Sequence, residues 1–197
     1  NLYMDAGYTI TENYDQYKGL EESVCMKKEL KKTIPASAFK GITDIEYFNF
    51  EEDFVEKNIR CIPMIVRFKM DKAGIKLKLA EWSRFSVEER IELARKPCGN
   101  GEETKQYNDY LAGLINRYTG KEATGLAIDQ HPSWADLNKV PDLLQEKLKE
   151  FGWYMSPEQW KELTNLQRFS LLKLCKQGHE SKNFPKALKE FGLISSS

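Results

Sequence analysis

The feature that most constrains the fold of this chain is a series of helix start and stop signals after residue 46. Pro63 suits the first turn of a helix, because a proline there loses no needed hydrogen bond. Gly74 follows eleven residues later and suits the left-handed position that ends a helix. Ser86 and Glu89 have the spacing of a capping box, in which each side chain binds the other residue's backbone N–H. Signals of this kind predict helices.

The spacing of apolar residues agrees with this prediction. A 3-4-3-4 pattern predicts a long amphipathic helix that ends at Gly120, through Tyr107, Tyr110, Leu111, Leu114, Ile115 and Tyr118. A polar loop is expected over residues 121–139. Later helices are expected from Pro141 (Leu143, Leu144, Leu148 and Phe151 inward, stop at Gly152), from Ser156-Pro157, from Thr164 with Gln167, and over Phe184, Ala187, Leu188 and Phe191, capped by Asn183.

No segment alternates convincingly enough to predict a core strand. Residues 75–79 alternate, but the segment is short and rich in lysine. The four tryptophans, Trp82, Trp134, Trp153 and Trp160, are expected to fill the core, and Trp134 in the loop is the best candidate for an exposed one. The predicted fold class is therefore all-α, a compact helical bundle over residues 46–197.

The chain also aligns with itself at an offset of 78 residues. Over residues 62–94 the offset gives six identities in 33 positions: Pro63/Pro141, Lys69/Lys147, Gly74/Gly152, Trp82/Trp160, Arg90/Arg168 and Leu93/Leu171. The capping pair Ser86/Glu89 falls on Thr164/Gln167. This pattern favours two similar helical units, about residues 62–118 and 140–194, that cover each other's apolar faces. The alternative is that helical proteins reuse the same start and stop signals.

Residues 1–45 differ from the rest and are interpreted as an N-terminal extension. Four tyrosines lie among acidic residues there without a helical or strand period: Tyr3, Tyr8, Tyr14 and Tyr17. Residues 20–32 are expected to form one lysine-rich helix, which Pro35 stops.

Composition excludes some classes of function. Thirty basic residues balance thirty acidic ones, so no net field attracts nucleic acid or an anionic membrane. The longest apolar run, residues 62–66, is far shorter than the roughly 20 residues of a transmembrane helix. The four cysteines have no zinc or redox spacing. We expect reduced thiols, and hence a reducing compartment: the cytoplasm, a chloroplast stroma or a mitochondrial matrix.

Few residues suit catalysis or metal binding. His131 lies in the polar loop without an orienting partner nearby in sequence. Cys175 and His179 would share one helix face and hold a metal if the helix continued through them, but Gly178 is expected to end it first. The other interpretation is a basic helix end that complements the helix dipole. We therefore predict no catalytic residue, no cofactor and no metal, and a protein that is not an enzyme.

Several segments resemble the nitrate reductase-associated protein family. They are Phe48–Phe54, Arg60–Lys69, Lys76–Trp82 and Gln167–Phe184, and the resemblance spans about residues 46–193. The N-terminal 45 residues have no counterpart in the family pattern. The resemblance implies a shared fold and a link to nitrate assimilation, and it assigns no functional residue.

Three functions remain open at this point. The first is a non-catalytic accessory subunit of a larger protein assembly, in the cytoplasm or in an organelle. The second is a chaperone or maturation factor for nitrate reductase or its molybdenum cofactor, and the third is a small metal-binding protein or enzyme that uses Cys175, His179 and Glu180. For the first function the candidate partner-binding residues are Tyr3, Tyr8, Tyr14, Tyr17, Trp134, His179, Glu180 and Lys182.

Overall fold

The structure is a computed structural model, and it describes residues 9–11, 25–27, 46–51, 62–176 and 179–194. The chain divides into one unit over Asn1–Ile34 and a second over Pro35–Ser197. In the first unit, strand β1 (Thr9–Thr11) pairs antiparallel with β2 (Cys25–Lys27), with Ile10 opposite Met26. The helix predicted over residues 20–32 is therefore wrong at residues 25–27, because pairing partners 14 to 18 residues away compete with local helix formation.

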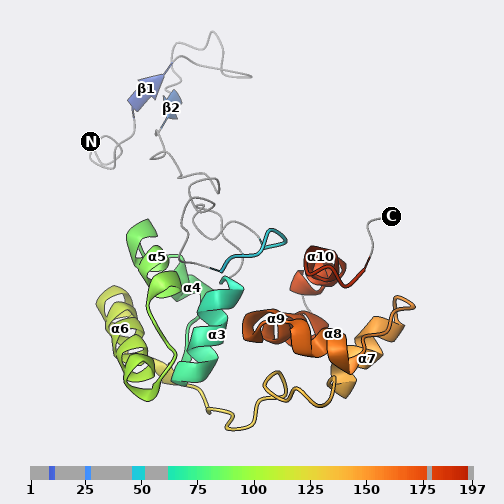
Figure 1. Cartoon of the computed structure of the whole chain (residues 1–197). Helices are drawn as coiled ribbons and strands as arrows, with labels where there is room; N and C mark the ends of the chain where they lie inside the picture. The colour runs from blue at the N-terminus through green and yellow to red at the C-terminus, as the bar shows by residue number, and fades with distance from the viewer. Residues whose placement is uncertain (1–8, 12–24, 28–45, 52–61, 177–178, 195–197) are drawn as a thin grey trace. The chain divides into compact units, whose positions relative to one another are not determined.

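The second unit is mostly helical (Figure 1). Its described residues form eight α-helices, one 3-10 helix and one two-stranded ladder. In chain order they are α3 (Met64–Ala73), β3 (Ile75–Lys76), α4 (Leu79–Trp82), α5 (Val87–Arg95), α6 (Gly101–Thr119), β4 (Thr124–Gly125), α7 (Asp142–Lys149), α8 (Pro157–Glu162), α9 (Asn165–Cys175), η2 (His179–Asn183) and α10 (Phe184–Glu190).

The predicted start and stop signals are confirmed at most helix ends. Pro63 immediately precedes α3, and Gly74 follows it with a φ of 63°, in the left-handed region. The Ser86 hydroxyl accepts a hydrogen bond from the Glu89 N–H at 3.2 Å, which completes the capping box of α5. Ser156 and Thr164 cap α8 and α9 in the same way. Local chemistry therefore sets these boundaries.

Two predictions about the later helices are wrong, one about a cap and one about buried residues. Asn183 makes no side-chain capping bond to α10, because its backbone already has an αR conformation at the end of η2. Leu143 and Phe151, which were expected to point inward from the helix after Pro141, are 47% and 40% exposed. Helix α7 ends at Lys149, so Phe151 lies beyond its periodic part, and only Leu144 and Leu148 of its leucines are buried.

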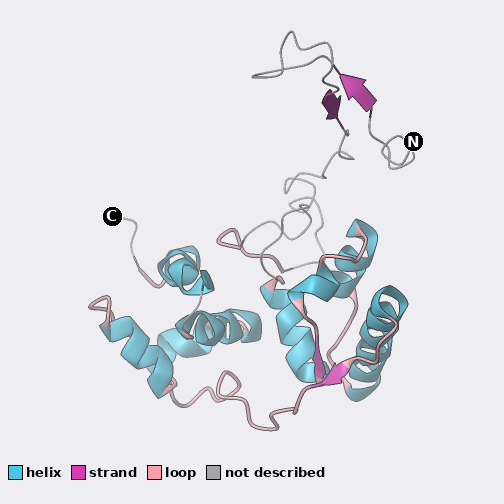
Figure 2. Cartoon of the chain, turned by 180° about the vertical axis from the view of Figure 1, so that it is seen from behind, coloured by secondary structure: helices cyan, strands magenta, loops and turns pink. Residues whose placement is uncertain are grey.

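Strands β3 and β4, which are far apart in the sequence, pair in a short ladder. The prediction of an all-α fold did not include this ladder. Ile75 lies opposite Gly125, and Lys76 lies opposite Thr124 (Figure 2). The Leu126 N–H also donates to the Gly74 carbonyl at 2.8 Å. The loop after α6 is thereby held against the end of α3.

The helices enclose two apolar clusters, and α3 contributes to both. The first cluster, built mainly from α3 to α6, includes Val66 and Met70. The second, built mainly from α7 to α10, includes Met64, and the partly buried Ile65 contacts both. Because successive residues of one helix point into different clusters, α3 connects the two cores.

Two tryptophans that align at the 78-residue offset have similar neighbours. Trp82 and Trp160 are both fully buried, and the core role predicted for them is confirmed. The Arg90 guanidinium lies 5.4 Å from the Trp82 ring centroid, and the Arg168 guanidinium lies 5.7 Å from that of Trp160. Gly152, the counterpart of Gly74, also has a positive φ, 72°.

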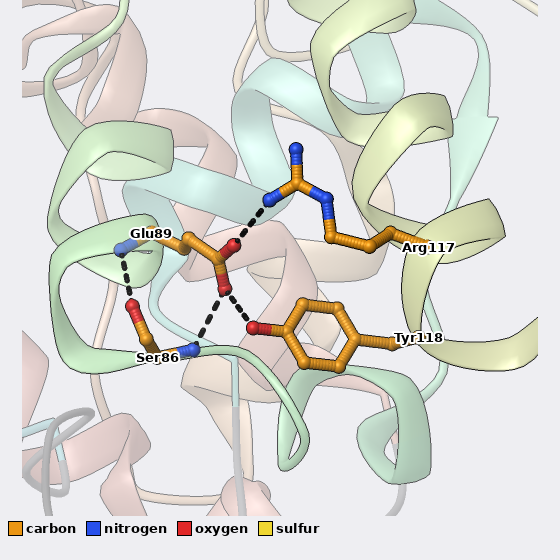
Figure 3. A network of polar contacts seen from close by, with 4 residues as sticks. All are labelled: Ser86, Glu89, Arg117 and Tyr118. Carbon is orange, nitrogen blue, oxygen red and sulfur yellow. Dashed lines mark hydrogen bonds and ion pairs between the residues drawn. The ribbon is translucent and has the colours of Figure 1, made fainter.

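A polar network joins the start of α5 to the end of α6 (Figure 3). The Glu89 carboxylate accepts hydrogen bonds from the Ser86 N–H at 2.8 Å, the Tyr118 hydroxyl at 2.7 Å and the Arg117 guanidinium at 2.9 Å. The bond to this carboxylate raises the pKa of Tyr118. A residue that would otherwise only cap one helix therefore also holds a second helix in place.

Lys69 of α3 crosses to the end of α5. Its Nζ donates to the Ala94 carbonyl at 2.5 Å and to the Lys96 carbonyl at 2.8 Å, which satisfies acceptors that every helix end leaves open. Burial lowers the pKa of Lys69 from 10.5 to about 8. The unfolded chain therefore holds more protons than the folded protein between about pH 8 and 10.5, and stability should rise with pH in that window.

We expect this rise to depend on Lys69. Between pH 7 and pH 9 the free energy of unfolding of the wild type should increase by about 1 kcal/mol relative to that of Lys69→Met, which lacks the titrating group. Urea unfolding of both proteins at the two pH values measures the difference. Cys175, whose pKa burial raises to about 12, titrates in both proteins, so its contribution cancels. Parallel pH profiles would contradict the assignment.

Candidate partner-binding groove

A groove of about 610 Å³ runs over α3, α9 and the loop between β4 and α7. Its apolar lining includes Leu126, Ile128, Trp134, Leu143, Phe169 and Leu172. Among the described residues, seven large apolar side chains are exposed, and three of them line this groove: Leu126 at 38%, Ile128 at 49% and Leu143 at 47%. The groove is therefore where exposed apolar surface of the described chain is concentrated.

Two aromatic rings line the groove, those of Trp134 and Phe169, and both are in contact with the ring of Phe68. Phe68 of α3 lies edge-on to Trp134, with ring centroids 5.1 Å apart, and edge-on to Phe169 of α9 at 5.2 Å. Phe169 is almost fully buried, whereas Trp134 is partly buried. Edge-to-face pairs of this kind fix ring positions, so this part of the groove is formed before any partner arrives.

Arg168 holds the loop that carries Trp134. Its Nε donates to the Trp134 carbonyl at 2.8 Å, and its other nitrogens donate to the Trp160 and Leu163 carbonyls and to the Asn165 side chain. The Trp160 indole N–H donates to the Asp136 carbonyl at 2.8 Å. The loop is thus tied to α8 and α9 through two part-buried hydrogen bonds.

The opposite wall depends on Gly74. A β-carbon added at Gly74 would lie 2.8 Å from Cγ1 of Ile128 and 3.1 Å from the Leu126 carbonyl oxygen. Ile128 therefore packs directly on the end of α3, and only glycine allows so close an approach with a positive φ.

Charged residues border the apolar lining. The Lys173 ammonium pairs with the Asp71 carboxylate at 2.8 Å. The Lys72 Nζ donates to the Cys98 carbonyl at 2.5 Å, and Lys176 is exposed just after α9 ends. Asp129 accepts the backbone N–H of His131 at 2.9 Å. Three lysines and two aspartates line the groove, so its excess charge is one positive charge.

His131 lines a second cavity of about 670 Å³ next to the groove, which shares Pro132, Ser133, Pro141 and Leu143 with it. Asp136 and Asp142 also line this cavity. Lys139 pairs with Asp142 at 2.7 Å, and Asp136 accepts the Asn138 N–H at 2.8 Å. Within the described part of the chain, no group of three His, Cys, Asp or Glu side chains is arranged to hold a metal.

The predicted partner-binding residues fall in three places. Trp134 lines the groove. His179, Glu180 and Lys182 belong to η2, where the exposed Lys182 lies near the start of α10. The four tyrosines of the extension, Tyr3, Tyr8, Tyr14 and Tyr17, lie outside the described residues. Trp134 therefore lines the groove, whereas none of the described η2 residues does.

The geometry around Cys175 differs from that of a metal site on one helix face. Helix α9 ends at Cys175, and His179 begins η2, so the two residues do not share a helix. Burial raises the pKa of Cys175 to about 12, which makes the thiolate rare at neutral pH and the thiol a poor nucleophile. Cys98 and Cys175 are both buried free thiols.

Sequence reasoning missed Leu126, Ile128 and Leu143 as groove residues. The first two lie in the loop that was expected to be polar, and the third was expected inside the core. Two hydrophobic residues spaced by two, at 126 and 128, within an otherwise polar loop were the available signal.

Comparisons with known proteins identify a family. Within the described residues, no helix is long and apolar enough to cross a membrane. The comparisons with curated proteins and with solved structures gave no match. Residues 47–191 match the conserved nitrate reductase-associated protein family (Nitr_red_assoc), and an N-terminal extension precedes the match. The chain, of which the match covers well over half, belongs to the conserved nitrate reductase-associated protein family.

Proposed function

We propose that this protein is a non-catalytic accessory protein that binds a segment of a partner protein in the groove over α3 and α9. The observation that carries the proposal is the concentration of exposed apolar side chains, Leu126, Ile128 and Leu143, in the groove that Trp134 and Phe169 also line. Exposed apolar surface rimmed by charge is typical of protein-interaction sites.

The free energy of burying apolar surface favours covering this groove with a partner over leaving it exposed to water. Covering a half-exposed leucine or isoleucine removes enough apolar area from water to contribute about 1 kcal/mol each. Three such side chains and one indole would therefore form a compact hot spot. The ordered aromatic face also reduces the entropy cost of binding, because little has to be fixed on contact.

Finer features of the proposal rest on other observations. The similar surroundings of Trp82/Arg90 and Trp160/Arg168 support two related helical units at the 78-residue offset. The two buried free thiols support a complex in a reducing compartment, the cytoplasm or an organelle. The tyrosine-rich extension would supply a second contact within a multi-subunit assembly, since tyrosine gives large contact area at low entropy cost.

Substitutions in the groove test the proposal. Tagged wild type, Ile128→Asp and Leu143→Asp are passed through a native extract, and the recovered protein is identified, purified and bound again to each variant. The matched control is Leu79→Asp, because Leu79 on α4 is 42% exposed and lies outside the groove. We expect both groove variants to lower the affinity for the purified partner at least tenfold, and the control to leave it unchanged.

Two further outcomes assign the contact. A chain without residues 1–40 that keeps its melting temperature and loses affinity would place part of the interface on the extension. Undiminished partner binding by both groove variants, with normal circular dichroism and melting, would refute the groove as the binding site.

A second candidate function is favoured by the family description, which names nitrate reductase. A chaperone or maturation factor for that enzyme or its molybdenum cofactor would bind it transiently and below one-to-one stoichiometry. Co-purification with newly made reductase, but not with mature reductase, would support this function over a permanent accessory subunit. Stable one-to-one association with mature enzyme, or with an unrelated protein, would exclude it.

A further inference from the structure

Resting on the proposed function, we propose that the segment bound in the groove is one amphipathic α-helix of the partner, with an acidic residue beside Lys176. The apolar face of this helix would contact Ile128, Trp134 and Leu143.

The helical form follows from what lines the inner side of the groove. Helices α3 and α9 are in contact there, since Phe68 meets Phe169 at 5.2 Å and Asp71 pairs with Lys173 at 2.8 Å. The surface of two packed helices presents ridges and furrows into which the side chains of a third helix fit. Apolar anchors spaced by three and four residues are the usual way for a helix to occupy such a groove.

In the described part of the chain, an extended segment of the partner would find few main-chain groups to pair with beside the groove. The nearest ladder consists of β3 and β4, which contribute two residues each. Strand addition gains its affinity from a row of main-chain hydrogen bonds, and a two-residue strand offers very few of them. A helix satisfies its own main-chain groups and needs only side-chain contact.

The charge of the groove determines which charged residues are favoured beside the apolar face of the partner helix. Asp71 is neutralised by Lys173, and Asp129 is engaged by the His131 N–H. The Lys72 Nζ donates to the carbonyl of Cys98, while Lys176 is exposed just after the end of α9. The excess positive charge therefore favours a carboxylate on the incoming helix, with Lys176 as the accessible contact.

Synthetic peptides test both parts of the proposal. Three fluorescein-labelled peptides of about 18 residues, long enough for helix formation, carry leucines at i, i+3, i+4 and i+7. The first has glutamates at the flanks, the second has lysines there, and the third repeats the first with a central proline. Fluorescence anisotropy with the full chain measures each affinity.

We expect the glutamate peptide to bind at least fivefold more tightly than the lysine peptide and at least tenfold more tightly than the proline peptide. Ile128→Asp and Leu143→Asp should each weaken its binding at least tenfold, and Leu79→Asp should leave it unchanged. Lys176→Glu should reverse the preference between the glutamate and lysine peptides. Thermal melting of every variant verifies that it is folded.

The outcomes separate this inference from the function on which it rests. If the proline peptide binds as tightly as the helical one, the helical form is wrong; if Lys176→Glu leaves the preference unchanged, the charge assignment is wrong. If no peptide binds while the groove variants still lose the natural partner, the helix is refuted and the groove remains a binding site. If the groove variants keep the natural partner, the proposed function itself fails.

Discussion

Replacing Gly74 by alanine should lower the free energy of unfolding by about 3 kcal/mol. A left-handed conformation costs an L-residue roughly 1–2 kcal/mol, and Gly74 has a φ of 63°. The new methyl group would also meet Ile128 at 2.8 Å and the Leu126 carbonyl oxygen at 3.1 Å, and relieving such overpacking costs about 1–3 kcal/mol more. Urea unfolding measures the loss.

Gly152→Ala is the matched control for this experiment. Gly152 has a similar φ of 72°, but a β-carbon added there would have no heavy atom of the described residues within 4 Å. The free energy of unfolding of Gly152→Ala should fall only by the cost of the left-handed conformation, about 1 kcal/mol. Equal losses at the two positions would show that the contact with Ile128 and Leu126 does not constrain the groove wall. The Gly74 variant should also bind the partner more weakly, because the displaced residues line the groove.

Replacing Arg168 by methionine should cost about 3–4 kcal/mol of stability. The guanidinium donates to three carbonyl oxygens, those of Trp134, Trp160 and Leu163, and the bonds to Trp160 and Leu163 are buried. A buried acceptor left without a partner costs roughly 1–3 kcal/mol, which exceeds the value of the bond it lost. The loop that carries Trp134 should loosen as well, so partner affinity should fall together with the melting temperature.

Arg90→Met provides the comparison, because Arg90 aligns with Arg168 at the 78-residue offset in the sequence. Arg90 is as buried as Arg168 and lies over Trp82, but its Nη2 donates to the Ser83 carbonyl, and its buried Nε has no hydrogen-bond partner among the described residues. Methionine there removes an unsatisfied donor together with one bond, so the expected loss is about 1 kcal/mol. A loss as large as that of Arg168→Met would mean that stacking on tryptophan, rather than hydrogen bonding, gives these arginines their value.

The helix boundaries were predictable because their causes are local. Pro63, Gly74 and the pair Ser86/Glu89 act within one or two turns, so the sequence contains the whole interaction. Pairing of Ile75 with Gly125 was not predictable, since it joins residues fifty positions apart. A two-residue ladder also leaves no periodic signal in the sequence.

The groove was largely hidden for the same reason. Trp134 was singled out as a contact residue, but Ile128 matters only because the ladder brings it onto Gly74. Leu143 obeys the helical spacing of its segment and is nevertheless exposed, because spacing defines a face and only tertiary packing decides whether that face is covered. The extra hydrogen bonds of Glu89 to Arg117 and Tyr118 were equally invisible, although its capping role was predicted.

The position of α3 has a consequence for how the protein tolerates damage. Val66 and Met70 of this helix complete one core, while Met64 helps to complete the other. A substitution that unfolds α3 therefore exposes both apolar clusters at once. Neither cluster should stay folded while the other unfolds. Unlike a protein made of independent modules, the helical unit should lose both clusters in one cooperative step when α3 unfolds.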